Sequence, residues 1–256
     1  MQLSLSGRLI EIAYKDVAMP TPDFIAMAKE TGYQGVELRM TQVPQDAASP
    51  EIARIKSALD SNKMRHTRLL THDVQEKKWD SFVKYVEVAR ALNAESVGIW
   101  VHDVEWTRKA CEYLKKFNLP LVLQTHAGKY IGTPEDCHKF TADVNCDNLF
   151  YMYDPSHFYM AHKPYGPEIV EQFKGKIFCG GFQKYGVETD AKGQPHSFEL
   201  PWDSERGVQL QAAIEGFRKI GYDGFITVIE PLEKGQDHRE RALYFATQLK
   251  RMLAAG

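Results

Sequence analysis

Two stretches far apart in the chain, KETGYQGV at residues 29–36 and RKIGYDGF at residues 218–225, repeat one pattern. In each, the first glycine suits the left-handed conformation just past a helix, and the second glycine precedes a strand. This repeated helix-to-strand connector predicts a chain built from strand–helix units. It indicates an architecture and by itself says nothing about function.

Short β-branched or aliphatic runs alternate with amphipathic stretches along the chain, which is typical of parallel strands joined by helices. Eight strands are predicted, over Leu9–Ala13, Gly35–Arg39, Arg65–Leu70, Val97–Val101, Leu121–Thr125, Leu149–Tyr153, Ile177–Phe182 and Phe225–Ile229. Eight helices are predicted, over Thr21–Thr31, Pro50–Ser61, Trp79–Leu92, Glu105–Phe117, Thr133–Thr141, Gly166–Phe173, Glu205–Ile220 and Asp237–Leu253. Thr21 and Thr133 each precede a proline and an early acidic residue, which marks a helix start.

The number of units and the length of 256 residues favour an α/β fold of one kind, a (β/α)8 TIM barrel that forms a single domain over residues 1–256. An open, doubly wound sheet usually has five or six strands and a glycine-rich first turn. No G-x-G-x-x-G or Walker-type loop is present in the sequence.

The composition restricts the class of partner. The 32 basic and 34 acidic residues are interspersed and give a formal charge of −2, so we expect no nucleic-acid partner. The sequence MQLSLSGRLIEIA at the start lacks the features of a signal peptide, and no apolar run is long enough for a membrane span. The four cysteines show no CxxC spacing. We therefore expect a cytoplasmic protein with reduced thiols, either monomeric or a homo-oligomer.

Four consecutive predicted strands end in a polar residue that is in phase with apolar ones. Residues two apart in a strand share a face. The four sets are Val122, Gln124 and His126; Phe150, Met152 and Asp154; Ile177, Cys179, Gly181 and Gln183; and Ile226, Val228 and Glu230. Because working residues of a barrel lie at the carboxyl ends of its strands, we expect a site there.

Each of these residues also has an ordinary structural interpretation. Asp154 and Glu230 each precede a proline, so one can cap a turn and the other can end a strand in solvent. His126 and His157 can be packing or hydrogen-bonding histidines. The case for a functional site is that polar ends of consecutive strands converge in space.

At these positions the sequence resembles the xylose-isomerase-like TIM barrel superfamily, the sugar phosphate isomerases and epimerases. The resemblance is carried by GYQGVEL at residues 32–38, QTHAG at residues 124–128, DPSH at residues 154–157 and IEP at residues 229–231. It implies an enzyme that acts on a small carbohydrate.

The resemblance also implies a divalent metal bound by a Glu, an Asp, a His and a Glu after strands five to eight. The matching residues here are Gln124, Asp154, Gln183 and Glu230. The two glutamines lower the ligand charge to −2, so we expect weakly held Mn²⁺ or Mg²⁺, or no metal at all. If His126 or His157 replaces a ligand, Zn²⁺ becomes plausible.

These replacements bear on mechanism as well. Gln124 has no titratable group, which leaves Glu230 as the expected base, with His157, His126 or a cation at the substrate oxygen. A sugar isomerase or epimerase is the first interpretation. A lyase or dehydratase acting on a keto-sugar and a non-catalytic, metal-free sugar-binding barrel are the alternatives. An endonuclease for abasic DNA needs a zinc cluster and a basic groove, which the sequence does not supply.

The connection at residues 184–202 is too long for a plain link, so we expect it to cover the substrate. Within it, Lys184 and His196 are candidate substrate ligands. Trp100 offers a flat apolar face on which a sugar ring can stack.

Overall fold

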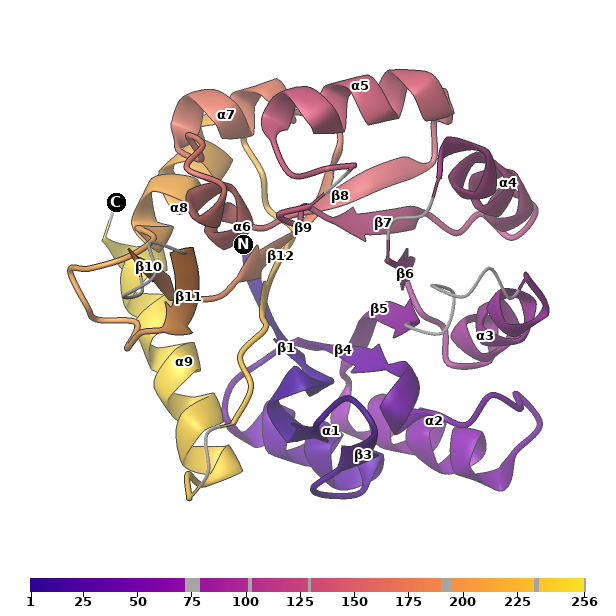
Figure 1. Ribbon diagram of the computed structural model, residues 1–256. Helices are drawn as coiled ribbons and strands as arrows, with labels where there is room; N and C mark the ends of the chain where they lie inside the picture. Colours follow the sequence, from indigo (N-terminus) through magenta and orange to yellow (C-terminus); the bar gives the residue numbers. More distant parts are fainter. Residues whose placement is uncertain (72–78, 101–102, 129, 190–194, 233–234, 256) are drawn as a thin grey trace.

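The computed structural model describes residues 1–71, 79–100, 103–128, 130–189, 195–232 and 235–255. Within these residues, parallel strands form a closed barrel in the order β1-β12-β9-β8-β7-β6-β5-β4, and helices surround it (Figure 1). The barrel strands are β1 (Gln2–Ser6), β4 (Gly35–Arg39), β5 (Arg65–Thr71), β6 (Val97–Ile99), β7 (Leu121–Gln124), β8 (Leu149–Tyr153), β9 (Ile177–Phe182) and β12 (Phe225–Val228). The predicted TIM barrel is confirmed.

The helices alternate with the strands, as the amphipathic stretches predict. They are α1 (Thr21–Glu30), α2 (Pro50–Asn62), α3 (Trp79–Ala91), α4 (Val104–Lys115), α5 (Pro134–Val144), α6 (Pro155–Met160), α7 (Pro167–Gln172), α8 (Leu210–Lys219) and α9 (His238–Ala254). Thr133 caps α5 by accepting the amide proton of Asp136, with Pro134 at the first helical position. No described helix is long and apolar enough to cross a membrane.

The first predicted strand, Leu9–Ala13, is wrong. The first barrel strand is β1, which pairs with β12 and β4. The segment that follows β1 is a 3-10 helix, η1 (Gly7–Ile10), and then a small hairpin of β2 (Glu11–Ile12) and β3 (Asp16–Val17). The reason lies in the barrel interior, where Ser4 contacts Thr67 with 3.0 Å between their hydroxyl oxygens. A strand with small polar residues on its inner face lacks the apolar run from which strands were predicted.

Other elements also differ from the sequence-based prediction. Helix α6 follows β8 directly and was not predicted, and α8 begins at Leu210 rather than Glu205. Val101, the last residue of a predicted strand, lies outside the described residues. The long connection after β9 contains two antiparallel strands, β10 (Tyr185–Thr189) and β11 (Pro195–Glu199). Residues 190–194 also lie outside the described residues.

Two hydrophobic cores follow from strand alternation. The larger one lies between the barrel and the helices and includes Ile226 and Val228. The smaller one includes Val122, Met152 and Cys179. A Cβ on Gly181 would approach Met152 and Ile229 within 3.0 Å, so β9 has only a hydrogen at its closest approach to this second core. Residues of β7, β8 and β9 thus fill the barrel interior below the polar strand ends.

Candidate functional site

Asp154, at the end of β8, is the centre of the polar cluster. Its side chain is fully buried. Oδ1 accepts the amide proton of Ser156 at 3.0 Å and thereby caps helix α6. Asp154, which was expected at most to cap a turn, thus caps a helix, and this role uses only one of the two carboxylate oxygens.

The second carboxylate oxygen of Asp154 is hydrogen-bonded to residues at the ends of the two neighbouring strands. Its Oδ2 accepts hydrogen bonds from Gln124 Nε2 at 2.8 Å and from Gln183 Nε2 at 2.6 Å. Burial raises the pKa of Asp154, while the hydrogen bonds from Ser156, Gln183 and Gln124 act in the opposite direction. The ends of β7, β8 and β9 thus meet in one network, as their common phase predicts.

His126 and His157 lie against each other beside this network. Their ring centroids are 3.9 Å apart with an interplanar angle of 32°. Nδ1 of His126 is 2.9 Å from the carbonyl oxygen of Ala127. Since a carbonyl only accepts, Nδ1 carries the proton and Nε2 retains the lone pair. Burial, followed by the nearby His157, lowers the pKa of His126 to about 4, so the ring is neutral at physiological pH.

His157 is the more buried of the two imidazoles. Its Nε2 lies 3.8 Å from Asp154 Oδ2 and 3.5 Å from Gln183 Nε2. Burial lowers the pKa of His157 to about 4. The structure therefore brings both predicted histidines into contact with the polar cluster, both in the neutral state.

Glu230, just past β12, is held separately from this cluster. Its Oε1 accepts hydrogen bonds from Lys184 N at 2.7 Å and from Trp202 Nε1 at 2.8 Å. The side chain is almost completely buried, and burial raises its pKa to about 8 against the opposing effect of these two donors. Ile226 and Val228 were expected to share the inner face with Glu230, which is wrong. They pack on the helix side, and Phe225 and Ile229 belong to the inner cluster.

The end of β9 connects the two carboxyl groups. The side chain of Gln183 binds Asp154, and the backbone amide of the next residue, Lys184, binds Glu230. Asp154 and Glu230 therefore flank one strand end without sharing a hydrogen-bond donor. The negative charge of Asp154 adds to the burial that raises the pKa of Glu230.

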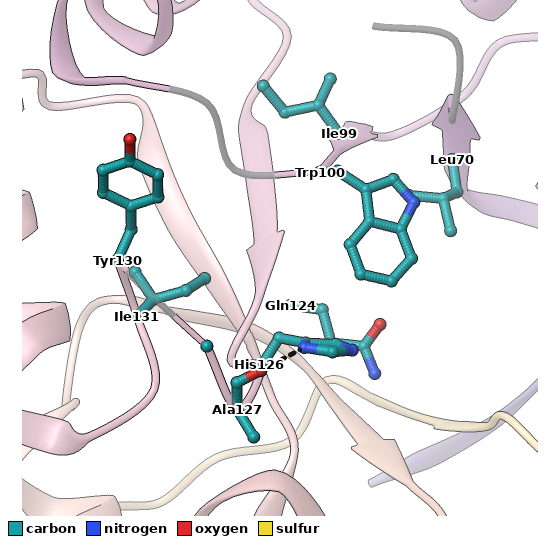
Figure 2. Close-up of a pocket in the computed structure, with 9 residues that line it drawn as sticks. Leu70, Ile99, Trp100, Gln124, His126, Ala127, Tyr130 and Ile131 are labelled. Atoms are coloured by element: carbon teal, nitrogen blue, oxygen red, sulfur yellow. Dashed lines mark hydrogen bonds between the residues drawn. The ribbon is translucent and has the colours of Figure 1, made fainter. Parts of the chain in front are cut away.

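A cavity of about 250 Å³ opens next to the cluster. It is lined by Leu70, Ile99, Trp100, Gln124, His126, Ala127, Gly128, Tyr130 and Ile131. Figure 2 shows Trp100, Ile99 and Leu70 on one side, Tyr130 and Ile131 on another, and Gln124 and His126 between them. Trp100 crosses His126 edge-on, with ring centroids 4.9 Å apart. The predicted stacking residue Trp100 thus lies at the cavity.

The two candidate ligands on the long connection lie elsewhere. The ammonium group of Lys184 is buried and donates to the carbonyl oxygen of Val208 at 2.6 Å, and burial lowers its pKa. His196 is exposed on β11, opposite Glu188 of β10. Neither residue lines the cavity. A substrate contact for either one stays a prediction.

The opposite side of the barrel holds a chain of buried ion pairs. Glu37 on β4 is 2.8 Å from Arg68 Nε and 3.8 Å from Arg39 Nη1, and it accepts a hydrogen bond from Ser6. Arg39 Nε lies 3.0 Å from a carboxylate oxygen of Glu11. Gly98 makes room for Arg68, because a Cβ there would lie 2.9 Å from Arg68 Nε. Both acidic residues of this ion-pair cluster, Glu11 and Glu37, therefore have an arginine partner.

The residues expected to hold a metal do not fit one in the observed arrangement. Gln124 and Gln183 direct their amide nitrogens at Asp154, and Oε1 of Glu230 is occupied by two N–H donors. A hard cation binds oxygen atoms, so both amides would have to turn over before these residues formed a cage. In the described part of the chain, no group of three or more His, Cys, Asp and Glu residues is arranged for a metal. The metal stays a prediction.

Sequence reasoning missed several residues of this region. Trp202, at the end of the long connection, binds Glu230 through its indole N–H. Leu70, Ile99 and Ile131 line the cavity and carry no chemical signal in the sequence. Glu37 and Arg68 did have a signal, because a charge inside a buried strand requires a partner.

Comparisons with known proteins agree with this architecture. A family model described as Xylose isomerase-like TIM barrel matches residues 25–249, and the chain belongs to this family. No curated protein matches the sequence. The family resemblance suggested by the motifs is thus confirmed.

Solved structures share the fold at low sequence identity. A xylose isomerase-like TIM barrel protein from Mycobacterium smegmatis, in complex with magnesium, is 17% identical with a TM-score of 0.71 over 98% of this chain and 97% of that chain. A probable 3-DHS dehydratase from Bacillus anthracis is 18% identical, with a TM-score of 0.76 and coverage of 98% and 99%. D-allulose 3-epimerase from Methylomonas sp. is 15% identical, with a TM-score of 0.74 and 98% of both chains covered.

Proposed function

We propose that this family member is an enzyme that removes a proton next to a carbonyl group of a small polyhydroxylated substrate, as a sugar isomerase or epimerase does. The observation that carries the proposal is the contact between the ends of β7, β8 and β9 beside a cavity. There, two imidazoles whose pKa values are lowered by burial lie beside the buried Asp154 carboxyl, whose pKa burial raises. Titratable groups with shifted pKa values gather at active sites more often than elsewhere.

Glu230 is the proposed base. A base works best when its pKa lies near the working pH, and a pKa of about 8 satisfies this condition. Trp202 and Lys184 N hold Oε1, which fixes the orientation of the carboxyl group. Proton abstraction at carbon would then be assigned to the carboxylate form, whose share increases with pH and reaches one half at about pH 8.

His126 is the proposed second proton-transfer group. Gln124, the residue at the position of a family glutamate, cannot exchange a proton, but His126 follows two residues later and lines the cavity. Its neutral ring offers the lone pair of Nε2, because Nδ1 is bound to Ala127. An acid–base pair formed by Glu230 and His126 would replace the two glutamates expected of epimerases.

A dehydratase is the second candidate. A structural neighbour bears that description, and elimination of water from a keto compound starts with the same proton removal. The two reactions differ in the next step. In the dehydratase, a hydroxyl leaves from the adjacent carbon, and His126 would need to be protonated to assist it.

Proton exchange with solvent tests the proposal. The protein is incubated in D2O with a panel of free and phosphorylated ketoses, and deuterium incorporation at carbon is followed by NMR. We expect exchange on at least one of these sugars, reduced by about 10²- to 10⁴-fold in Glu230→Gln and in His126→Gln. Glu171→Gln, an exposed carboxyl on α7, is the matched control and should exchange at the normal rate.

The outcomes separate the candidates. Exchange together with an unsaturated product identifies the dehydratase. Normal exchange in Glu230→Gln would remove Glu230 from the mechanism. Absence of exchange on every sugar of the panel would reject the isomerase or epimerase proposal.

A further inference from the structure

The cavity beside His126 has a mostly apolar lining. Six of its side chains are Leu70, Ile99, Trp100, Ala127, Tyr130 and Ile131. We propose that this cavity binds a flat, uncharged, hydroxylated ring of the ligand, such as a phenol. The inference goes beyond the proposed function, because it concerns a ring-shaped ligand group held in this cavity and not the polyhydroxylated part of the substrate.

The lining selects against a sugar ring inside the cavity. Each hydroxyl group that is taken out of water without a hydrogen-bond partner carries a free-energy cost. Among the described lining residues, polar side-chain atoms belong to Trp100, Tyr130, Gln124 and His126, and those of Gln124 and His126 lie together at one edge (Figure 2). A pyranose carries hydroxyls around its whole rim and would leave most of them facing apolar groups.

The size and shape suit one ring. An engineered apolar cavity of about 150 Å³ in another protein holds benzene, and about 250 Å³ leaves space for a ring with a short substituent. Trp100 provides an aromatic wall, and Tyr130 and Ile131 lie across from it (Figure 2). Offset or edge-to-face contact between a ligand ring and the Trp100 indole would be favourable.

The polar edge determines which substituent the ring carries. Gln124 uses Nε2 to bind Asp154, so its carbonyl oxygen is left as an acceptor. His126 uses Nδ1 to bind Ala127, so its Nε2 is an acceptor too. Two neighbouring acceptors match a ligand that donates, which is a hydroxyl group. They do not match a carboxylate or a phosphate, because these groups only accept hydrogen bonds.

The test uses 4-fluorophenol, followed by 19F NMR on the intact protein. We expect saturable binding that D-glucose at equal concentration does not displace. The matched probe 4-fluoroanisole lacks the O–H donor and should bind at least about fivefold more weakly, because the acceptors are then left unpaired. No turnover is needed, so this experiment can succeed where deuterium exchange fails, and the reverse.

Variants locate the probe. Trp100→Ala should weaken 4-fluorophenol binding at least about fivefold through loss of the aromatic contact. Ile131→Phe should block it by filling the cavity. Trp79→Phe alters a tryptophan that packs on Trp106 and Tyr113, away from the cavity, and should bind the probe normally. Circular dichroism verifies that each variant is folded.

Four results would overturn the inference. These are absence of saturable binding of 4-fluorophenol, displacement of the probe by D-glucose, equal binding of 4-fluoroanisole, and unchanged binding in both Trp100→Ala and Ile131→Phe.

Discussion

The buried carboxyl groups on the two sides of the barrel differ in the charge of the groups that contact them. Glu37 and Asp154 are equally buried, with no exposed surface. Glu37 lies between Arg68 and Arg39, so its charge is compensated. Asp154 is held by two neutral amides and a serine, and Glu230 by an indole and a backbone amide.

The difference teaches that burial alone does not make a carboxyl group reactive. An opposite charge stabilises the ionised form, whereas neutral donors offset only part of the loss of hydration. The pKa values of Asp154 and Glu230 are accordingly raised by burial. We therefore interpret the β4–β5 side as structural and the side formed by β7, β8, β9 and β12 as chemical.

The largest expected effect tests the structural side. Glu37→Gln leaves Arg68 buried without its counter-charge and should lower the free energy of unfolding by about 3 to 5 kcal/mol. Asp154→Asn is the matched variant. Asp154 has no cationic partner that the substitution would leave unpaired. The variant should lower the free energy of unfolding by about 2 kcal/mol, because the asparagine cannot accept both hydrogen bonds from Gln124 and Gln183 as the carboxylate does. Urea unfolding followed by circular dichroism measures both.

A loss in Asp154→Asn as large as that in Glu37→Gln would contradict this division of the barrel. It would place the neutral network among the main sources of stability.

The second effect concerns pH and Glu230. Its pKa is about 8 in the folded protein and 4.5 as the ordinary value, so the folded chain retains a proton that the unfolded chain has lost between these limits. The contribution of Glu230 to stability is therefore present at low pH and declines as pH increases from 4.5 to 8. The decline is on the order of 1 kcal/mol per pH unit.

Thermal melting of the wild type and Glu230→Gln over pH 5 to 9 measures this dependence. The amide cannot ionise, so the variant should gain in melting temperature relative to the wild type as pH rises to about 8, and no further above it. Glu188→Gln serves as the exposed control. A constant difference across the range would show that Glu230 is ionised throughout.

The smallest expected effect concerns the metal. Gln124→Glu restores a third negative charge to the set formed with Asp154, Gln183 and Glu230, and it should raise the affinity for Mn²⁺ at least about tenfold over the wild type. Isothermal titration calorimetry measures it. Gln211→Glu on α8 adds the same charge away from the site. If both variants gain equally, the strand-end residues are not the ligands.

The sequence predicted the strand ends better than their partners. Gln124, Asp154 and Gln183 share a face with apolar residues of their strands, and the structure brings them into contact. The same argument was wrong for Glu230, because Ile226 and Val228 face the helices. Alternation holds within a strand, and Glu230 lies beyond the end of β12.

The sequence by itself determined the alternation of strands and helices, because periodicity, helix caps and glycine positions are local properties of a chain. It also determined the family and the polar residues at successive strand ends. The tertiary structure alone decided that Gln2–Ser6 closes the barrel, that Trp202 binds Glu230, and that residues from the ends of β5, β6 and β7 line one cavity. These features depend on contacts between distant segments, and the direction of a hydrogen bond across such a contact is set only when the strands close into a barrel.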